Sequence, residues 1–332
     1  MSQPAPIPAP PSRPEGPQAL AAIDIGTNTI RLLVAAPATT GDGVAFTPLE
    51  TRTATVRLGL GVERTGRLDP ERMTRAVATV EEFRRTALAH GARAILLAAT
   101  SAVRDAANGA ELRGRIAATS GLTIEIIDGE REAALTFAGA TAGQSLAGTV
   151  LVGDLGGGSL ELIVARDGAV RSARSLQIGS GRLTERHMAS DPPDRAMITA
   201  AEADARETIA PHAAASPPVD RLILVGGTAA SLPSLAPESD GARILTGRRL
   251  GAALAVLTAA PAARVAAETG LDPERVRVLP AGVAIFRALF AAYGLDSALI
   301  GSGGIREGLI MEYLRQGEAR RASDERRATS DD

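Results

Sequence analysis

The chain contains one short pattern twice, and this repeat constrains its fold more than composition does. The second copy, residues 149–165, reads TVLVGDLGGGSLELIVA: an apolar run, a carboxylate, three glycines, a serine and another apolar run. The first copy, residues 20–36, reads LAAIDIGTNTIRLLVAA. Short apolar runs bounded by turn residues are typical of buried strands, so each copy is predicted to be an antiparallel strand pair. Two copies in one chain predict two duplicated lobes that face each other across a cleft.

The turn residues of each copy have the chemistry of a phosphate site. Glycines bring backbone N–H groups unshielded to a surface, where they can surround phosphate oxygens. The carboxylates Asp24 and Asp154 end the first strand of each copy, where they can hold a divalent cation directly or through water. Ordinary hairpins with glycine turns are the alternative interpretation, and the matched carboxylates favour the phosphate site. The predicted phosphate-binding residues are Gly26, Thr27, Asn28 and Thr29 in the first copy, and Gly156, Gly157, Gly158 and Ser159 in the second.

Composition excludes several kinds of site. The 332 residues are 45% hydrophobic, which is enough for two cores, and the net charge of -2 argues against a nucleic-acid or membrane surface. There is no cysteine, which excludes disulfides, thiolate zinc sites and cysteine nucleophiles. There is also no lysine, so all 36 basic residues are arginines. Arginine is therefore the only strong cation available to bind phosphate, and mechanisms that need a P-loop or Schiff-base lysine are excluded.

Residues 19–145 are predicted to form the first lobe and residues 146–315 the second, each a mixed five-stranded α/β sheet with helices on both faces. Residues 1–18 are rich in proline and lack both a basic start and a long apolar core, which predicts a disordered tail and not a signal peptide. The charged residues 316–332 are expected to form a second disordered tail. No later stretch reads as apolar enough to span a bilayer, so a cytoplasmic protein is expected.

Some element boundaries can also be predicted. Asp69-Pro70-Glu71 and Asp272-Pro273-Glu274 each place a capping carboxylate before a proline and an acid, which predicts a helix start. Residues 53–58 are predicted to form a third strand, and residues 281–293 a buried helix.

From Leu20 to about Leu314 the sequence resembles the Ppx/GppA family of exopolyphosphatases and guanosine pentaphosphate phosphohydrolases. This family belongs to the superfamily of acetate kinase, sugar kinases, Hsp70 and actin. The resemblance implies two actin-like (ribonuclease H-like) lobes, and it is to the short two-lobe members, because longer members carry an extra carboxyl-terminal helical domain. The ordered motifs that carry it are IDIGTNTIRLLVA from Ile23, ATSAVRDAANG from Ala99, IIDGEREA from Ile126, VGDLGGGSLELIVA from Val152, IGSGRLTER from Ile178, VGGTAASL from Val225 and GGIREGLI from Gly303.

The resemblance also implies roles for single residues. Glu132 matches the family's catalytic glutamate, which would take a proton from the attacking water. By itself, a glutamate at this position is more often a solvated helix-start acid, and Glu130 is a neighbour that could be confused with it. Arg104 matches the arginine that reaches the phosphate chain. Glu161 matches a site acid that would organise Mg²⁺, or Mn²⁺, together with the two strand-end aspartates.

The implied activity is magnesium-dependent hydrolysis of the terminal phosphate of inorganic polyphosphate. The alternatives are hydrolysis of the 5′ γ-phosphate of guanosine pentaphosphate (pppGpp), an ATP-binding kinase or switch on the same fold, and a non-catalytic sensor of polyphosphate or alarmone. The family suggests a homodimer, and neither a nucleic-acid nor a membrane partner is expected. The glycine pairs Gly226-Gly227 and Gly303-Gly304 match superfamily nucleotide contacts or serve close packing, and the sequence leaves both interpretations open.

Overall fold

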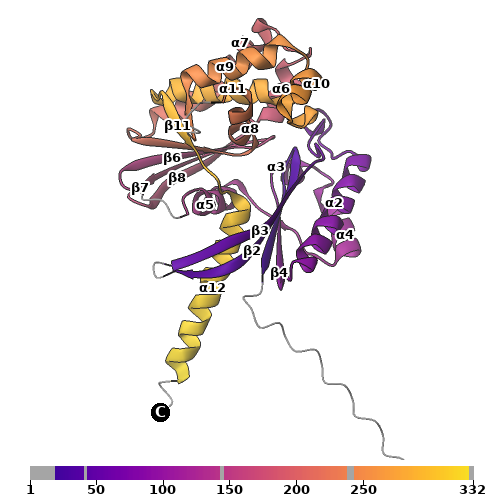
Figure 1. The fold of residues 1–332 in the computed structure, drawn as a ribbon, viewed down its shortest axis with the longest axis vertical. Coiled ribbons are helices and arrows are strands. Elements are labelled where there is room, and N and C mark those ends of the chain that lie inside the picture. Colours follow the sequence, from indigo (N-terminus) through magenta and orange to yellow (C-terminus); the bar gives the residue numbers. More distant parts are fainter. Residues whose placement is uncertain (1–18, 41–42, 143–145, 238–242, 329–332) are drawn as a thin grey trace, which may run out of the picture.

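The computed structural model describes residues 19–40, 43–142, 146–237 and 243–328, so the predicted tail at residues 1–18 lies outside the described residues. The described part contains two mixed sheets, one of five strands and one of six, with helices packed around them (Figure 1). The first sheet is formed by β1 (Leu20–Ile25), β2 (Thr29–Thr40), β3 (Gly43–Thr55), β4 (Ala94–Ala99) and β5 (Glu125–Ile126). The second is formed by β6 (Thr149–Leu155), β7 (Leu160–Arg166), β8 (Ala169–Leu176), β9 (Arg221–Val225), β10 (Ile244–Thr246) and β11 (Ser297–Ile300).

The two sheets share one local topology. The strand orders are β3-β2-β1-β4-β5 and β10-β11-β9-β6-β7-β8. In the first sheet β1 pairs antiparallel with β2 and parallel with β4, and in the second β6 pairs antiparallel with β7 and parallel with β9. The prediction of two duplicated α/β lobes is therefore confirmed. The prediction of five strands is wrong for the second sheet, where the three-residue β10 adds a short antiparallel edge beside β11.

Helices cover both sheets. Those that precede β6 are α1 (Val62–Thr65), α2 (Pro70–Ala89), α3 (Ser101–Asp105), α4 (Gly109–Ser120) and α5 (Gly129–Ala140). Those that follow are α6 (Ser180–His187), α7 (Arg195–Ala214), α8 (Gly227–Leu235), α9 (Gly247–Ala259), α10 (Ala262–Thr269), α11 (Pro273–Tyr293) and α12 (Ile305–Ala328). The predicted helix starts at Asp69 and Asp272 are confirmed, because each side chain accepts a hydrogen bond from the backbone N–H three residues later.

Two helices lie between the sheets and cross the predicted lobe boundary (Figure 1). Helix α12 follows the last strand of the second sheet, but its residues Ile305 and Ile310 share a core cluster with Leu20 and Leu33 of the first sheet. Helix α5 precedes the second sheet, yet its buried Ala133 and Phe137 belong to a cluster with Val152, Ile163 and other residues of that sheet. Each helix buries an apolar stripe on the sheet of the other half of the chain, so the lobes are not two contiguous segments.

Three predicted boundaries are wrong. Strand β3 begins at Gly43 and not at residue 53, because β2 continues to Thr40 and offers it partners along its whole length. Residues 273–293 form one helix, α11, that continues through Pro280 because burial of its side chains compensates for the missing hydrogen bond. Helix α12 extends into the predicted tail as far as Ala328, because that segment is rich in helix-forming alanine, arginine and glutamate.

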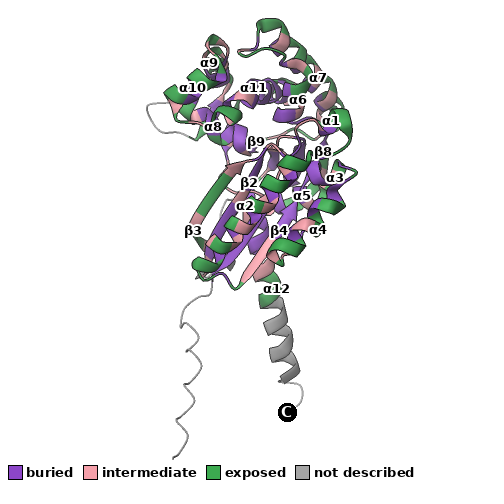
Figure 2. Ribbon diagram, turned by 90° about the vertical axis from the view of Figure 1, so that its right-hand side faces the viewer, coloured by how far each residue is buried: buried purple, intermediate pink, exposed green. Residues whose placement is uncertain are grey.

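Helix α11 is the core helix of the second lobe. By length and composition it could cross a membrane, with a mean hydropathy of 1.5, contrary to the expectation that no stretch would. However, 72% of its 18-residue apolar window is buried inside the protein, and Phe286 is fully buried. Figure 2 shows α11 largely in the colour of buried residues. Its apolar character is therefore explained by the core that it fills.

Candidate functional site

The two copies of the repeated pattern form matching turns. The Gly26 N–H donates to the Thr29 carbonyl at 3.0 Å, and the Gly156 N–H donates to the Ser159 carbonyl at 3.0 Å. Both turns connect a central strand of their sheet to its antiparallel neighbour. A local pattern of carboxylate, glycine and hydroxyl residues therefore produces the same backbone geometry in both lobes.

The turns meet face to face at the junction of the lobes. A Cβ atom added to Gly157 would lie 2.6 Å from Asn28 Cγ, and one added to Gly158 would lie 2.5 Å from Ser101 Oγ. Thr27 Oγ1 is within hydrogen-bond distance, 2.9 Å, of Ser101 Oγ in the same region. Glycine is therefore required in the second turn because the backbone of one lobe approaches side chains of the other.

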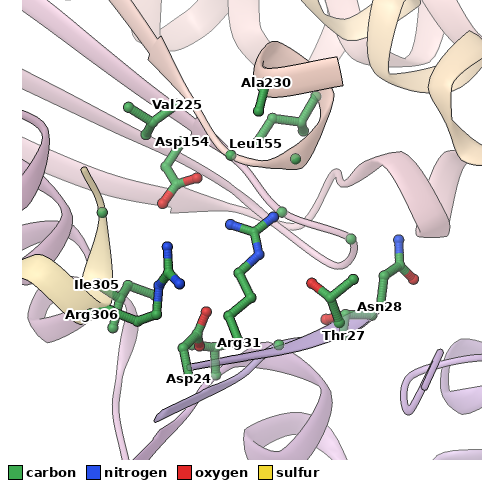
Figure 3. A pocket seen from close by; sticks show the side chains of 18 of the residues that line it. Asp24, Thr27, Asn28, Arg31, Asp154, Leu155, Val225, Ala230, Ile305 and Arg306 are labelled. Atoms are coloured by element: carbon green, nitrogen blue, oxygen red, sulfur yellow. The ribbon is translucent and has the colours of Figure 1, made fainter. Parts of the chain in front are cut away.

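A cavity of about 370 Å³ lies between the turns. It is lined by all of the residues predicted for the site except Arg104 and Gly158. Figure 3 shows Asp24 and Asp154 projecting into it from opposite lobes, with the Arg31 side chain reaching between them. The predicted residues on its wall are Asp24, Gly26, Thr27, Asn28, Thr29, Glu132, Asp154, Gly156, Gly157, Ser159 and Glu161.

Glu132 lies in the first turn of α5, which begins where the Asp128 side chain accepts a hydrogen bond from the Arg131 N–H at 2.8 Å. Glu132 is only 4% exposed and lines the cavity, whereas Glu130 is exposed. The two neighbouring glutamates, which the sequence alone could not separate with certainty, are thus distinguished by the side of the helix on which they lie.

Arg104 lies behind Glu132 and not on the cavity wall. Its Nη1 donates to Glu132 Oε2 at 2.9 Å and to the Ile127 carbonyl at 3.0 Å, and its Nε lies 3.4 Å from Asp105 Oδ1. Its predicted contact with the phosphate chain stays a prediction. In this structure the guanidinium holds the carboxylate that faces the cavity.

Four carboxyl groups lie near one another here, of which Glu132 and Glu161 are buried and Asp24 and Asp154 partly buried, and loss of contact with water raises the pKa of each. The pKa of Asp24 rises to about 6, although Arg31 and Arg306 oppose the shift. The pKa of Glu132 rises to about 7 despite the neighbouring Arg104. The pKa values of Asp154 and Glu161 are also raised by burial, while Thr136 and Ser175 donate hydrogen bonds to them at 3.0 and 2.8 Å. Mutual repulsion among the acids contributes to these shifts.

Sequence reasoning missed three arginines that line the cavity: Arg31, Arg275 and Arg306. Burial lowers the pKa of Arg275 to about 10, and the nearby Arg31 contributes. In the described part of the chain, neither Arg31 nor Arg275 has an ion-pair partner, so both guanidinium groups are available to an anion. Arg31 could have been found, because it occupies in the first copy the position that Glu161 occupies in the second.

The two glycine pairs, for which the sequence left nucleotide contact and close packing both open, lie in different surroundings. Gly226 and Gly227 line the cavity, and a Cβ on Gly227 would lie 2.6 Å from Arg275 Cζ. Gly303 also lines it, but a Cβ there would lie 2.0 Å from the Gly139 carbonyl oxygen. Gly303 is therefore required by the close packing of α5 beside the start of α12.

The donor set at the junction suits a hard divalent cation that is only partly held by protein. No three acidic or histidine side chains within the described ranges converge closely enough to enclose a metal ion. However, Asp24 Oδ1 is buried without a hydrogen-bond partner, and the Asp154 carboxylate is close enough to raise the pKa of Asp24. Mg²⁺ is commonly held by one or two carboxylates, waters and substrate phosphates, and these residues fit that pattern.

Comparison with known proteins extends the likeness to nearly the whole chain. Residues 38–316 match the model of the Ppx/GppA phosphatase family. The exopolyphosphatase 1 of Mycobacterium tuberculosis H37Rv is 31% identical over 307 residues, 89% of this chain and 88% of that protein. The exopolyphosphatase 2 of the same strain is 34% identical over 316 residues, 88% of this chain and 97% of that protein.

Two further relatives extend the comparison. A guanosine-5'-triphosphate,3'-diphosphate pyrophosphatase of Vibrio atlanticus is 27% identical over 305 residues, 91% of this chain and 61% of that protein. The crystal structure of the Aquifex aeolicus Ppx/GppA family member has a TM-score of 0.72 at 26% identity, covering 90% of this chain and 98% of that one. Sequence, fold and family model agree: this chain belongs to the Ppx/GppA phosphatase family, and it is an enzyme that hydrolyses phosphoanhydride bonds.

Proposed function

We propose that the protein is an exopolyphosphatase, which removes the terminal phosphate of inorganic polyphosphate. The observation that carries this proposal is the buried Glu132 on the wall of a cavity between two facing phosphate turns. The similarity to exopolyphosphatases along almost their full length supports the choice of substrate.

In the proposed mechanism the two turns and the cavity arginines bind the terminal phosphates. Backbone N–H groups and guanidinium groups offset the charge of the phosphoryl oxygens, which is the main demand of this reaction. Glu132 accepts a proton from the attacking water. A general base works best when its pKa lies near the operating pH, and a pKa of about 7 meets this condition.

The proposal includes a magnesium ion, which would be held by Asp24 and Asp154. When bound, it would neutralise phosphate charge and orient the chain for in-line attack. Charge repulsion from Glu132 and from Asp154 raises the pKa of Glu161, so the three carboxyl groups are close enough to interact. It is therefore placed to hold a water or a proton beside the base.

Hydrolysis of pppGpp is the second candidate. It is favoured by the similarity to the Vibrio atlanticus enzyme and by Gly226 and Gly227 on the cavity wall, which match the positions of nucleotide contacts in the superfamily. The same turns, base and cation site would serve either substrate.

The test is phosphate release by the purified protein with Mg²⁺ from short polyphosphate, long polyphosphate, pppGpp and ATP. Glu132→Gln should lower the turnover roughly 10²- to 10⁴-fold with substrate binding largely intact, because it removes the base but keeps the shape of the side chain. Glu130→Gln is the matched control, since that exposed residue lies in the same helical turn.

Loss of activity in Glu132→Gln with full activity in Glu130→Gln is the expected result. Release from pppGpp alone would move the assignment to the second candidate. Normal turnover in Glu132→Gln would remove this residue from the mechanism, and release from no substrate would favour the non-catalytic sensor.

A further inference from the structure

Arg182, in the first turn of α6, holds the second phosphate turn from behind. Its Nε donates to the Gly158 carbonyl at 2.9 Å, and its backbone N–H donates to the Gly157 carbonyl at 3.0 Å. The turn is packed tightly on α6, because a Cβ added to Gly179 would lie 2.5 Å from the Gly157 carbonyl carbon. The backbone and the side chain of Arg182 therefore both hold this turn in place.

The same guanidinium reaches across to the first lobe. Its Nη1 donates to Glu63 Oε2 in α1 at 3.3 Å, and its Nη2 donates to Asp105 Oδ2 at the end of α3 at 3.4 Å. The Arg182 side chain is 18% exposed, so these contacts are partly shielded from solvent. One arginine thus contacts a phosphate turn of one lobe and two carboxylates of the other.

Asp105 continues this chain of contacts to the base. While its Oδ2 accepts from Arg182, its Oδ1 lies 3.4 Å from Arg104 Nε. Arg104 in turn donates to Glu132 at 2.9 Å. A continuous series of charged contacts therefore runs from the second phosphate turn through Arg182, Asp105 and Arg104 to Glu132.

We propose that Arg182 and Asp105 are positioning residues that make the orientation of Glu132 depend on closure of the two lobes. The proposal rests on the proposed function, because it takes Glu132 as the base. When the lobes are together, Asp105 is held by Arg182, and Arg104 is fixed between two carboxylates. When they separate, Asp105 loses its partner in the second lobe, and Arg104 loses part of the support that aims Glu132 at the cavity.

Arg186 provides a matched control one helical turn further along α6. Its Nε donates to Glu63 Oε1 at 2.5 Å and its Nη1 to Asp204 Oδ2 at 3.2 Å. It therefore pairs with the same first-lobe acid as Arg182. Its contacts include neither the phosphate turn nor Asp105, and Glu63 keeps its contact with Arg182 when Arg186 is lost, so the series from the turn to Glu132 stays in place.

The first measurement is steady-state phosphate release from polyphosphate by Asp105→Asn, Arg182→Gln, their double variant and Arg186→Gln. Asp105→Asn should lower kcat about 10-fold with KM nearly unchanged, because Asp105 does not line the main cavity and a misplaced base slows chemistry. The double variant should be no slower than the slower single variant, since both interrupt one series. Arg186→Gln should keep kcat within about 2-fold.

The second measurement reports lobe closure without any reaction. The chain has no cysteine, so spin labels can be placed specifically at Glu111→Cys in α4 and Arg206→Cys in α7, two exposed positions on opposite lobes. Arg182→Gln should broaden the distribution of distances between the two spin labels or shift it to longer distances, and Asp105→Asn should do so to a smaller extent. Thermal midpoints of all variants check that each is folded.

Full kcat in both Asp105→Asn and Arg182→Gln overturns the proposal, as does independent, multiplicative slowing in the double variant. A distance distribution that is unchanged in Arg182→Gln overturns the dependence on closure, even for a protein that releases no phosphate. The failure of phosphate release by the unmodified protein would instead contradict the proposed function, which separates the two results.

Discussion

Two arginines of the site act on different partners. Arg104 contacts Glu132 and does not line the cavity, whereas Arg275 lines the cavity and has no ion-pair partner in the described part of the chain. Arg104 is placed to influence the reaction through Glu132, the proposed base, and Arg275 is placed to act on the substrate directly. Their substitutions should therefore separate into effects on turnover and effects on substrate binding.

Arg104→Ala should mainly lower kcat, while Arg275→Ala should mainly raise KM. Without the Arg104 guanidinium, only the burial and the surrounding acids Asp24 and Asp154 act on Glu132, so its pKa rises above about 7. The base is then protonated at neutral pH, and the acid limb of the pH–rate profile should move to higher pH. Steady-state kinetics between pH 5.5 and 9 would measure both effects. An unchanged limb together with a raised KM in Arg104→Ala would instead indicate that Arg104 binds the substrate.

Helices α5 and α12 pack almost backbone to backbone. A Cβ on Gly308 would lie 2.1 Å from the Leu135 carbonyl oxygen, and one on Gly139 would lie 2.1 Å from the Gly304 carbonyl oxygen. Because α5 carries Glu132 and Thr136, this contact sets the depth at which the proposed base and a hydrogen-bond donor to Asp154 enter the junction. Small residues here are required by the approach of the two helices and not by turn geometry.

Gly308→Ala should destabilise the protein by about 1–3 kcal/mol, the usual cost of overpacking, since the backbone of α5 cannot yield as a side chain can. Gly114→Ala in α4 is the control, because nothing lies within 4 Å of an added Cβ there. That control should be neutral or stabilising by about 0.5–1 kcal/mol, since alanine favours the helix. Chemical denaturation would measure both variants, and equal stabilities for the two would refute the packing argument.

The protein as a whole brings four buried or partly buried acids together where its two lobes meet. Folding raises their pKa values. At any pH between the unfolded-state pKa values, near 4, and the folded-state pKa values, the folded protein therefore binds more protons than the unfolded protein. Over this interval the free energy of unfolding decreases as the pH rises. The junction is thus kept at a cost in stability that a bound cation would offset.

The thermal midpoint of the ligand-free protein should therefore be higher at pH 5.5 than at pH 7.5. Glu132→Gln should reduce this difference, because it removes a group whose pKa rises to about 7. Scanning calorimetry in the absence of divalent cations would measure it. A midpoint that increases from pH 5.5 to 7.5 would show that the acids are not held in this unfavourable environment.

The sequence by itself determined the two glycine turns, their carboxylates Asp24 and Asp154, and the duplicated α/β lobes. These features depend on apolar periodicity and turn chemistry within about 17 residues, so they can be read without knowing the rest of the fold. The motif resemblance added Glu132, which the structure places on the cavity wall.

Only the tertiary structure decided which groups meet. Arg104 faces Glu132 and not the cavity, Arg275 enters the cavity from α11, and α12 returns to the first sheet after the second is complete. Each of these contacts joins segments that are far apart in the chain, and it depends on how helices bury their apolar faces. Local sequence patterns do not predict how distant helices pack, so the partners of these charged residues can be identified only in the assembled fold.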